Sequence, residues 1–183
     1  MKMKIYWYLV VLLVCALIIS GCTAAVNQYG ASIENVESLR SMQSTSKVKV
    51  NAFTSDELHK SINCRGTITI NTPDGKPFEE YIRNAFISEL RLAGIYANES
   101  SLAINGNFEK LEASSMMGDA KWMFKIIISS EGKEPFTVDS EYDFSESFFG
   151  DRACQEVPKA FVPAVQQLIN DIINHPKFAA MLQ

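Results

Sequence analysis

Hydrophobic and polar residues alternate along three segments in the second half of the chain, and this period of two is typical of β-strands. The segments are SLAINGNFEKLEASS (101–115), AKWMFKIIISS (120–130) and EPFTVDSEYDF (134–144). The middle segment is apolar on both sides, as expected of a central strand, and a turn at 131–133 would make the last two a hairpin. Two shorter alternating segments, KVKVNAF (47–53) and CRGTITI (64–70), predict two strands earlier in the chain.

The clearest helical pattern lies between Pro77 and Gly94. Apolar residues there recur every three or four positions and therefore share one face of a helix. Proline suits the first helical position, because its missing N–H would be unpaired there anyway, and glycine suits the left-handed residue that ends a helix. A second helix is predicted over 157–182, where Pro158 and Pro163 must lie in the opening turns or kink it, with a final short turn from Asn174.

The predicted order is therefore two strands, a helix, three strands and a helix. One mainly antiparallel sheet with a mixed edge, covered on a single face by both helices, would bury every apolar stripe. This arrangement is an α+β two-layer sandwich. We expect residues 47–183 to form this single domain. Residues 22–46 are rich in small and polar residues and predict a flexible tether, in which ASIENVESLRSM (31–42) is compatible with a short helical turn or two.

The first residues carry an export pattern. Lys2 and Lys4 precede an uncharged apolar run over 5–19, and small residues follow, which are the three regions of a signal peptide. The sequence Ile19-Ser20-Gly21-Cys22 resembles the bacterial lipobox. The resemblance implies cleavage between Gly21 and Cys22, attachment of diacylglycerol to the Cys22 thiol, and acylation of the new amino terminus. Several acyl chains would anchor the protein firmly to a membrane.

The order of elements behind this lipobox is similar to that of small envelope lipoproteins of Gram-negative bacteria, including uncharacterised and assembly or transport auxiliary ones. The resemblance implies a membrane-anchored protein that faces the periplasm. Thr23 follows the anchor cysteine. It is not the aspartate that retains such proteins in the inner membrane of enteric-type bacteria, so the inner leaflet of the outer membrane is the implied location. The domain resemblance is one of topology and carries no catalytic motif.

The net charge of the chain argues against two classes of partner. The formal net charge of the chain is −4, and loss of the signal would remove two lysines and no acid. Nucleic-acid binding needs clustered Lys and Arg to displace counterions, and an electrostatic hold on anionic lipid head groups needs the same. The composition therefore argues against both. We expect the membrane, reached through the lipid anchor, and an envelope protein of unidentified kind as partners.

The chain contains 4 cysteines. Cys15 would leave with the signal and Cys22 would carry lipid, so Cys64 and Cys154 remain. A pair of cysteines in an oxidising compartment predicts a disulfide. Closing a loop of this length, ~90 residues, contributes about 4–5 kcal/mol in the chain-entropy model. Two unpaired thiols or a metal site remain as alternatives, although the histidines, His59 and His175, lack close ligand spacing.

Catalytic patterns are weak. The chain has no Gly-x-Ser-x-Gly motif, and its glycines are too dispersed for a phosphate-binding loop. Cys64 with His59 is a conceivable nucleophile and base, but a disulfide would silence the thiol. The acidic row Asp139, Glu141 and Asp143 could bind Ca²⁺, yet alternating acids on a strand more often form a solvated face. We expect no enzymatic activity, no metal and no cofactor beyond the acyl chains.

Two adjacent phenylalanines, Phe148 and Phe149, fall in a predicted loop. They form either a lid on the core or an exposed patch for docking or acyl binding. Two functional classes remain open. The first is a non-enzymatic accessory module that docks a partner in envelope assembly, transport or maintenance. The second is a lipid- or small-ligand-binding lipoprotein, with a pocket between sheet and helices lined by Phe86, Trp122 and Phe124.

Overall fold

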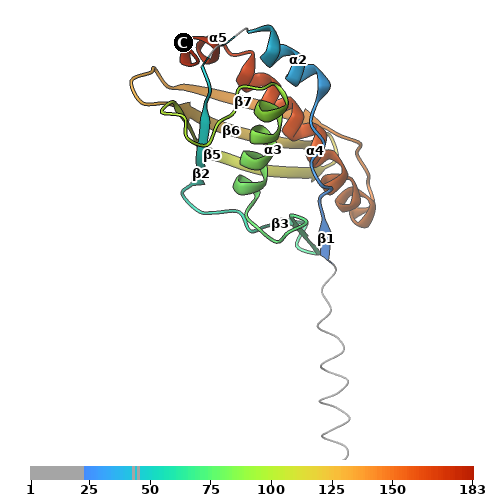
Figure 1. Cartoon of the computed structure of the whole chain (residues 1–183). Helices are drawn as coiled ribbons and strands as arrows, with labels where there is room; N and C mark the ends of the chain where they lie inside the picture. The colour runs from blue at the N-terminus through green and yellow to red at the C-terminus, as the bar shows by residue number, and fades with distance from the viewer. Residues whose placement is uncertain (1–22, 43, 45) are drawn as a thin grey trace, which may run out of the picture.

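The computed structural model describes residues 23–42, 44 and 46–183, so the predicted signal peptide, its cleavage point and Cys22 lie outside the described residues. Figure 1 shows the arrangement of the elements. In chain order they are β1 Thr23–Ala25, α2 Ile33–Ser41, β2 Lys49–Ser55, β3 Ser61–Cys64, β4 Ile68–Asn71, α3 Phe78–Leu92, β5 Ala103–Met116, β6 Asp119–Ser129, β7 Phe136–Asp143, α4 Gly150–Ile173 and α5 Pro176–Met181. Within the described residues, no helix is both long enough and apolar enough to cross a membrane.

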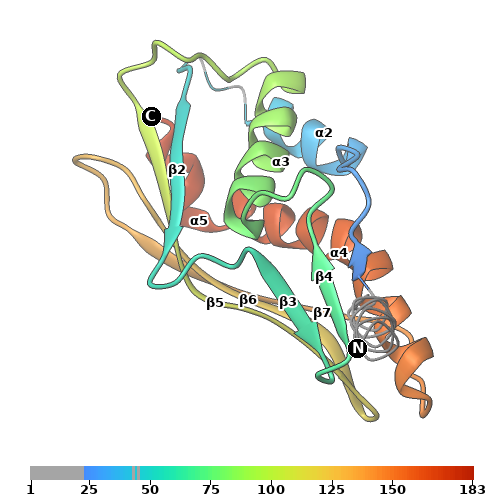
Figure 2. The same ribbon diagram turned by 90° about the horizontal axis from the view of Figure 1, so that it is seen from below.

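The main sheet has the strand order β2-β5-β6-β7. Neighbouring strands are antiparallel from β5 to β7, whereas β2 pairs parallel with β5 at one edge. Helices α3 and α4 cover the same face of this sheet, as the two views in Figures 1 and 2 show. The predicted α+β sandwich with a mixed edge is confirmed, and β6 is the interior strand that its apolar pattern indicated.

Gly106 in β5 has a packing role. A Cβ atom there would lie 2.7 Å from Cδ1 of the Phe53 ring on the neighbouring strand, which is too close for a real contact. The absence of a side chain therefore lets Phe53 lie across β5. The pairing of β2 with β5 is irregular at this point, between Val50 and Phe53, where Phe53 pairs with Gly106.

The segment CRGTITI does not join the main sheet. Residues 61–64 and 68–71 form a hairpin, and β1 adds to it in parallel to make a separate small sheet in the order β1-β4-β3. Figure 2 shows this sheet on the helical side of the main sheet, near the start of α4. The expectation of a single sheet was wrong in this respect. Alternation shows which residues are buried, but it does not show which strands they pair with.

The segment predicted as a flexible tether is folded from Thr23 to Met42. Val26 and Leu39 are buried in the main core. The Tyr29 hydroxyl and the backbone N–H of Ser32 both donate hydrogen bonds to the carboxyl group of Glu89 on α3. Burial raises the pKa of Glu89 above its usual value, although these hydrogen bonds oppose the rise. The helical turns expected over 31–42 are present as α2, but the prediction missed the packing of this segment, because its few apolar residues are buried against helices that are distant in sequence.

Helix α3 ends as predicted and begins within one residue of its predicted start. Pro77 is the N-cap, and Phe78 begins the helix one residue later than expected. Gly94 has φ of +81°, the left-handed conformation that glycine adopts without strain. The N–H of Ile95 then donates to the carbonyl of Leu90 at 3.0 Å, which satisfies one of the carbonyls left unpaired at the helix end.

Helix α4 begins at Gly150, seven positions before the predicted 157, so Pro158 and Pro163 lie inside it and not in its opening turns. A proline inside a helix removes the hydrogen bond to the carbonyl four residues earlier, and its ring crowds that carbonyl. Near Pro158, the indole Nε1 of Trp122 donates to the carbonyl of Val157 at 2.9 Å and ties the helix to β6. The predicted final turn is α5, with His175 as its N-cap.

The core between sheet and helices is filled by aromatic rings. The Trp122 ring lies 4.7 Å from Phe161 and 6.0 Å from Phe124, measured between centroids, and Phe86 lies 6.2 Å from Phe178. All five side chains are buried. The rings proposed as the lining of a ligand pocket therefore pack against each other and against helix residues.

Candidate contact surface at the disulfide-bonded end

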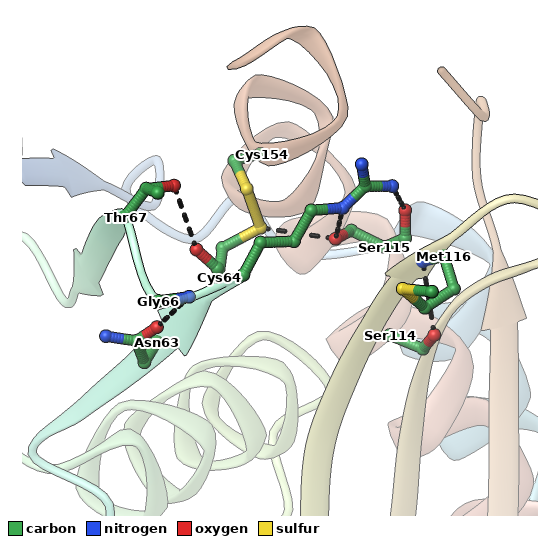
Figure 3. The surroundings of a disulfide bond; sticks show 9 residues. Asn63, Cys64, Gly66, Thr67, Ser114, Ser115, Met116 and Cys154 are labelled. Atoms are coloured by element: carbon green, nitrogen blue, oxygen red, sulfur yellow. Dashed lines mark hydrogen bonds between the residues drawn. A yellow bond between two sulfur atoms is a disulfide. The ribbon is translucent and has the colours of Figure 1, made fainter. Parts of the chain in front are cut away.

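Cys64 and Cys154 meet at one end of the molecule. The Sγ atoms are 2.00 Å apart and the Cα atoms 5.7 Å apart, and both residues are buried. Cys64 is the last residue of β3, and Cys154 lies in the second turn of α4 (Figure 3). The disulfide predicted from the cysteine pair thus joins the small sheet to the long helix.

The turn after Cys64 is held against the main sheet by Arg65. Arg65 and Gly66 have φ of 50° and 71°, as in the tight turns that connect antiparallel strands, and this conformation is unfavourable for arginine. The Arg65 guanidinium compensates by donating to the hydroxyl of Ser115 on β5 at 3.1 Å and to the Ser115 carbonyl. The Ser115 hydroxyl also lies 3.3 Å from the Cys64 sulfur (Figure 3).

Two turns project beside this connection. Met116 and Met117 follow Ser115 at the turn between β5 and β6, and Phe148 and Phe149 precede the first residue of α4. The turns are linked, because the N–H of Gly118 donates to the carboxylate of Glu146 at 2.9 Å. We call the side chains Met116, Met117, Phe148 and Phe149 together the tip surface.

The tip surface is exposed to solvent. The exposed fractions are 61% for Met116, 65% for Met117, 77% for Phe148 and 60% for Phe149. The two phenylalanine rings contact each other edge to face, with centroids 5.8 Å apart, and the Arg152 guanidinium lies over the Phe149 ring. These values exclude the interpretation of Phe148 and Phe149 as a lid on the core. Neighbouring exposed apolar side chains of this kind mark contact sites.

The described chain begins at the same end. In the small sheet, Thr23 on β1 pairs with Thr69 on β4, and the adjacent Ile68 pairs with Cys64 on β3. Cys64 is bonded to Cys154, which lies five residues after Phe149. Strand pairing and the disulfide therefore connect β1, through β4 and β3, to the first turns of α4, which follow Phe149 in the chain.

His59 and Cys64 do not form the nucleophile and base pair considered from the sequence. Its ring Nδ1 lies 2.7 Å from the buried carboxylate of Glu79 on α3, and Ser55 donates a hydrogen bond to the same carboxylate. Burial alone would raise the pKa of Glu79, but the hydrogen bonds from His59 and Ser55 outweigh it and lower the pKa below its usual value. The geometry indicates a structural connection between α3 and the loop after β2.

The acidic row on β7 is exposed. Asp139, Glu141 and Asp143 all lie on the face of the sheet opposite the helices, and Glu141 pairs with Lys121 on β6 at 3.0 Å. Among residues 23–42, 44 and 46–183, no three His, Cys, Asp or Glu side chains are grouped so that they could hold a metal ion.

Sequence reasoning found Phe148, Phe149 and the cysteine pair but missed Met116, Met117 and Arg65. The signal for the methionines was present, since two large apolar residues before a Gly-Asp pair are unusual in a hairpin turn. Arg65 could not be identified, because its role depends on the approach of β5. The tip side chains are apolar and exposed, and the cysteines beside them are bonded to each other, so this region is suited to contact.

No family model matches the chain, and no curated protein matches it. Among solved structures, protein XCC0632 from Xanthomonas campestris, described with the family model DUF330, is similar to this chain with a TM-score of 0.50 and 13% sequence identity. The match covers 87% of this chain and 93% of that one. At this identity the likeness concerns the fold alone, and it supports the α+β arrangement over most of the domain.

Proposed function

We propose that the protein is a lipid-anchored envelope lipoprotein that faces the periplasm and acts by contact as an accessory module, without catalysing a reaction. The anchor is Cys22, and the location implied by Thr23 is the inner leaflet of the outer membrane. Tethering a domain to a membrane raises its effective concentration toward partners in the same compartment, which is the advantage of such a module in envelope assembly, transport or maintenance.

The observation that carries this proposal is the position of β1. Thr23, the first described residue, is already paired with β4, in the small sheet that the disulfide bonds to the start of α4. A disulfide-bonded domain that begins one residue after a lipobox cysteine is consistent with an exported, anchored protein. The exposed Phe and Met side chains lie at the disulfide-bonded end, so the rest of the exposed surface remains open to a protein partner.

A small-ligand function has less support. The core rings Phe86, Trp122 and Phe124 are buried and pack against other rings, which does not favour the predicted pocket between sheet and helices. Surface clefts lie elsewhere: one of about 290 Å³ beside Tyr29 and Tyr81, one of about 430 Å³ beside Tyr142 and Lys159, and one of about 820 Å³ along residues 56–61. None of them is lined by the three rings predicted to form the pocket. We therefore favour contact over ligand carriage.

Cys22→Ser tests the anchor. We expect the variant to remain an unprocessed or soluble precursor that incorporates no labelled palmitate, whereas Cys15→Ser, within the signal, should be processed and labelled like the wild type. A Cys22→Ser protein that fractionates with membranes at wild-type mass and still takes up palmitate would show that the lipoprotein assignment is wrong.

The accessory role is tested by photo-crosslinking in intact cells. A photoreactive residue is placed at single exposed positions over the domain, and the adducts are identified by mass spectrometry. We expect one face to give a discrete envelope-protein adduct. Uniformly absent adducts at every exposed position, with the protein anchored and folded, would contradict the docking role.

A further inference from the structure

We infer that the tip surface rests on the lipid bilayer itself, so that the acyl anchor and the side chains of Met116, Met117, Phe148 and Phe149 enter the same membrane surface. This inference rests on the proposed lipidation of Cys22 and adds to it a defined orientation of the domain. The occupant of the exposed apolar surface is then the acyl and head-group boundary of the bilayer, and not a protein.

The first argument is the length of chain between anchor and domain. Thr23 is hydrogen-bonded into the small sheet, and Cys22 precedes it directly. Consecutive Cα atoms are about 3.8 Å apart, so a lipidated Cys22 cannot lie far from the end of β1. The segment that would have allowed the domain to stand away from the membrane, residues 23–42, is instead folded onto α3 and α4. An acylated Cys22 therefore draws this end of the domain to the bilayer.

The second argument is the placement of exposed apolar residues. Two turns that are distant in sequence present four large apolar side chains at this end, linked through Gly118 and Glu146. The remaining large exposed hydrophobic residues of the described chain lie singly on other elements: Ile33 on α2, Leu58 in the loop after β2 and Leu92 on α3. Phenylalanine and flexible methionine side chains are well suited to the irregular boundary between head groups and acyl chains.

The third argument is the charge around the tip surface. Exposed Arg65 and Arg152 are accompanied by exposed Glu146 and Asp151, so the end carries both signs. A surface that bound membranes through charge would show an excess of Lys and Arg. Contact here would therefore depend on apolar burial, and it should persist at high ionic strength and on uncharged lipid.

The test uses the full-length lipoprotein reconstituted into phosphatidylcholine vesicles with brominated acyl chains, which quench tryptophan on contact. Trp7 lies in the predicted signal, so the mature chain has one tryptophan, Trp122, which is buried and serves as an internal reference. Phe148→Trp places a probe on the tip surface. Ile33→Trp is the matched control, because Ile33 and Phe148 have the same exposed fraction of 77% and lie on different parts of the molecule.

We expect brominated lipid to reduce the added emission of Phe148→Trp by about twofold or more, since an interfacial side chain lies within reach of the acyl chains. Ile33→Trp should show no such loss, and molar salt should not restore the Phe148→Trp emission. Equal quenching of the two variants, no quenching of either, or restoration by salt would each overturn the inference. Melting curves that match the wild type confirm that both variants are folded.

Failure of the anchor and failure of the orientation give different results. A protein without acyl chains by mass, which does not float with the vesicles, contradicts the proposed lipidation. A lipidated protein that floats, but whose Phe148→Trp probe is unquenched, contradicts only the contact of the tip surface with lipid. A photoreactive residue at position 148 that yields a discrete protein adduct in cells, together with an unquenched probe, would assign the tip surface to a protein partner instead.

Discussion

The two ends of the molecule differ in whether their hydrophobic side chains are buried or exposed. At the end formed by α2 and α5, Phe178 lies on a helix of only 6 residues and is 0% exposed. At the disulfide-bonded end, Phe148 lies two positions before α4, a helix of 24 residues, and is 77% exposed. Figure 1 shows α2 and α5 at one end and β1 and β3 toward the other. A short helix is thus sufficient to bury a phenylalanine in this fold.

The difference shows how each end is stabilised. The α2–α5 end is closed by apolar packing, with Leu39 and Phe178 in the core. The disulfide-bonded end is closed by the bond between Cys64 and Cys154 and by the hydrogen bonds between Arg65 and Ser115. Since a covalent bond and polar contacts hold this end together, its apolar side chains are not needed inside. They remain available for contact with something outside the chain.

The largest expected effect is loss of the disulfide. Cys64→Ala should lower the free energy of unfolding by about 4 kcal/mol, because the unfolded chain regains the freedom of the long loop that the bond closes. Denaturant titration measures the change. On non-reducing gels, the wild type should migrate faster than after reduction, and the variant should show no difference. Equal unfolding midpoints with and without reductant would show that the disulfide does not contribute to the stability of the fold.

At the opposite end, a cavity in the core should lower the free energy of unfolding. Leu39→Ala removes a fully buried side chain from α2 and should cost about 3 kcal/mol in the free energy of unfolding. Ile33→Ala, on the exposed side of the same helix, should change it by less than about 0.5 kcal/mol. If the two variants were equally stable, α2 would not be part of the folded core and the tether interpretation would return.

Glu79 and Glu89 lie in the first and last turns of α3, and they test the comparison through the pH dependence of the free energy of unfolding. Glu79→Gln should cost about 2 kcal/mol at pH 7, since it weakens charge-assisted hydrogen bonds to a buried carboxylate. The pKa of Glu79 is lowered in the folded state, so its contribution is present above the usual value of 4.5 and is lost as pH falls through the folded pKa. The loss caused by Glu79→Gln should therefore shrink in acid.

Glu89 should behave in the reverse sense. Its pKa is raised in the folded state, so its stabilising contribution is present below 4.5 and is lost as pH rises through the folded pKa. The neutral side chain of Glu89→Gln should consequently become more favourable, relative to wild type, as pH increases. Unfolding titrations of both variants from pH 3 to pH 8 check the two trends. Parallel pH profiles would show that the environments of the two carboxyl groups do not differ as the structure indicates.

The smallest effect on stability is expected at the tip surface. Phe148→Ser combined with Phe149→Ser should change the free energy of unfolding by less than about 0.5 kcal/mol per site, because exposed side chains lose few contacts. Thermal melting measures this directly. A loss as large as that of Leu39→Ala would mean that the rings belong to the core, and the contrast between the two ends would disappear.

Local sequence was sufficient for the elements whose stability is local. The helix from Phe78 to Leu92 has its proline start, its apolar face and its glycine end within one continuous stretch. The alternation in β6 and β7 identified the buried face of each strand, and the turn between them determined that they pair. The cysteine pair was predicted by count and compartment, without knowledge of the geometry.

Other features were decided only by the tertiary structure, because they depend on residues that are far apart in sequence. The pairing of β1 with β4, the burial of Leu39 and the contact of Arg65 with Ser115 each join segments whose own patterns do not reveal the partner. The exposure of Phe148 and Phe149 is of the same kind. Two phenylalanines in a loop are buried or exposed according to what other elements cover them, and the sequence of the loop does not contain that information. The sequence alone thus determined most strands and the core of both long helices, the cysteine pair and the resemblance to a lipobox, and the tertiary structure decided which hydrophobic side chains are left exposed at the surface.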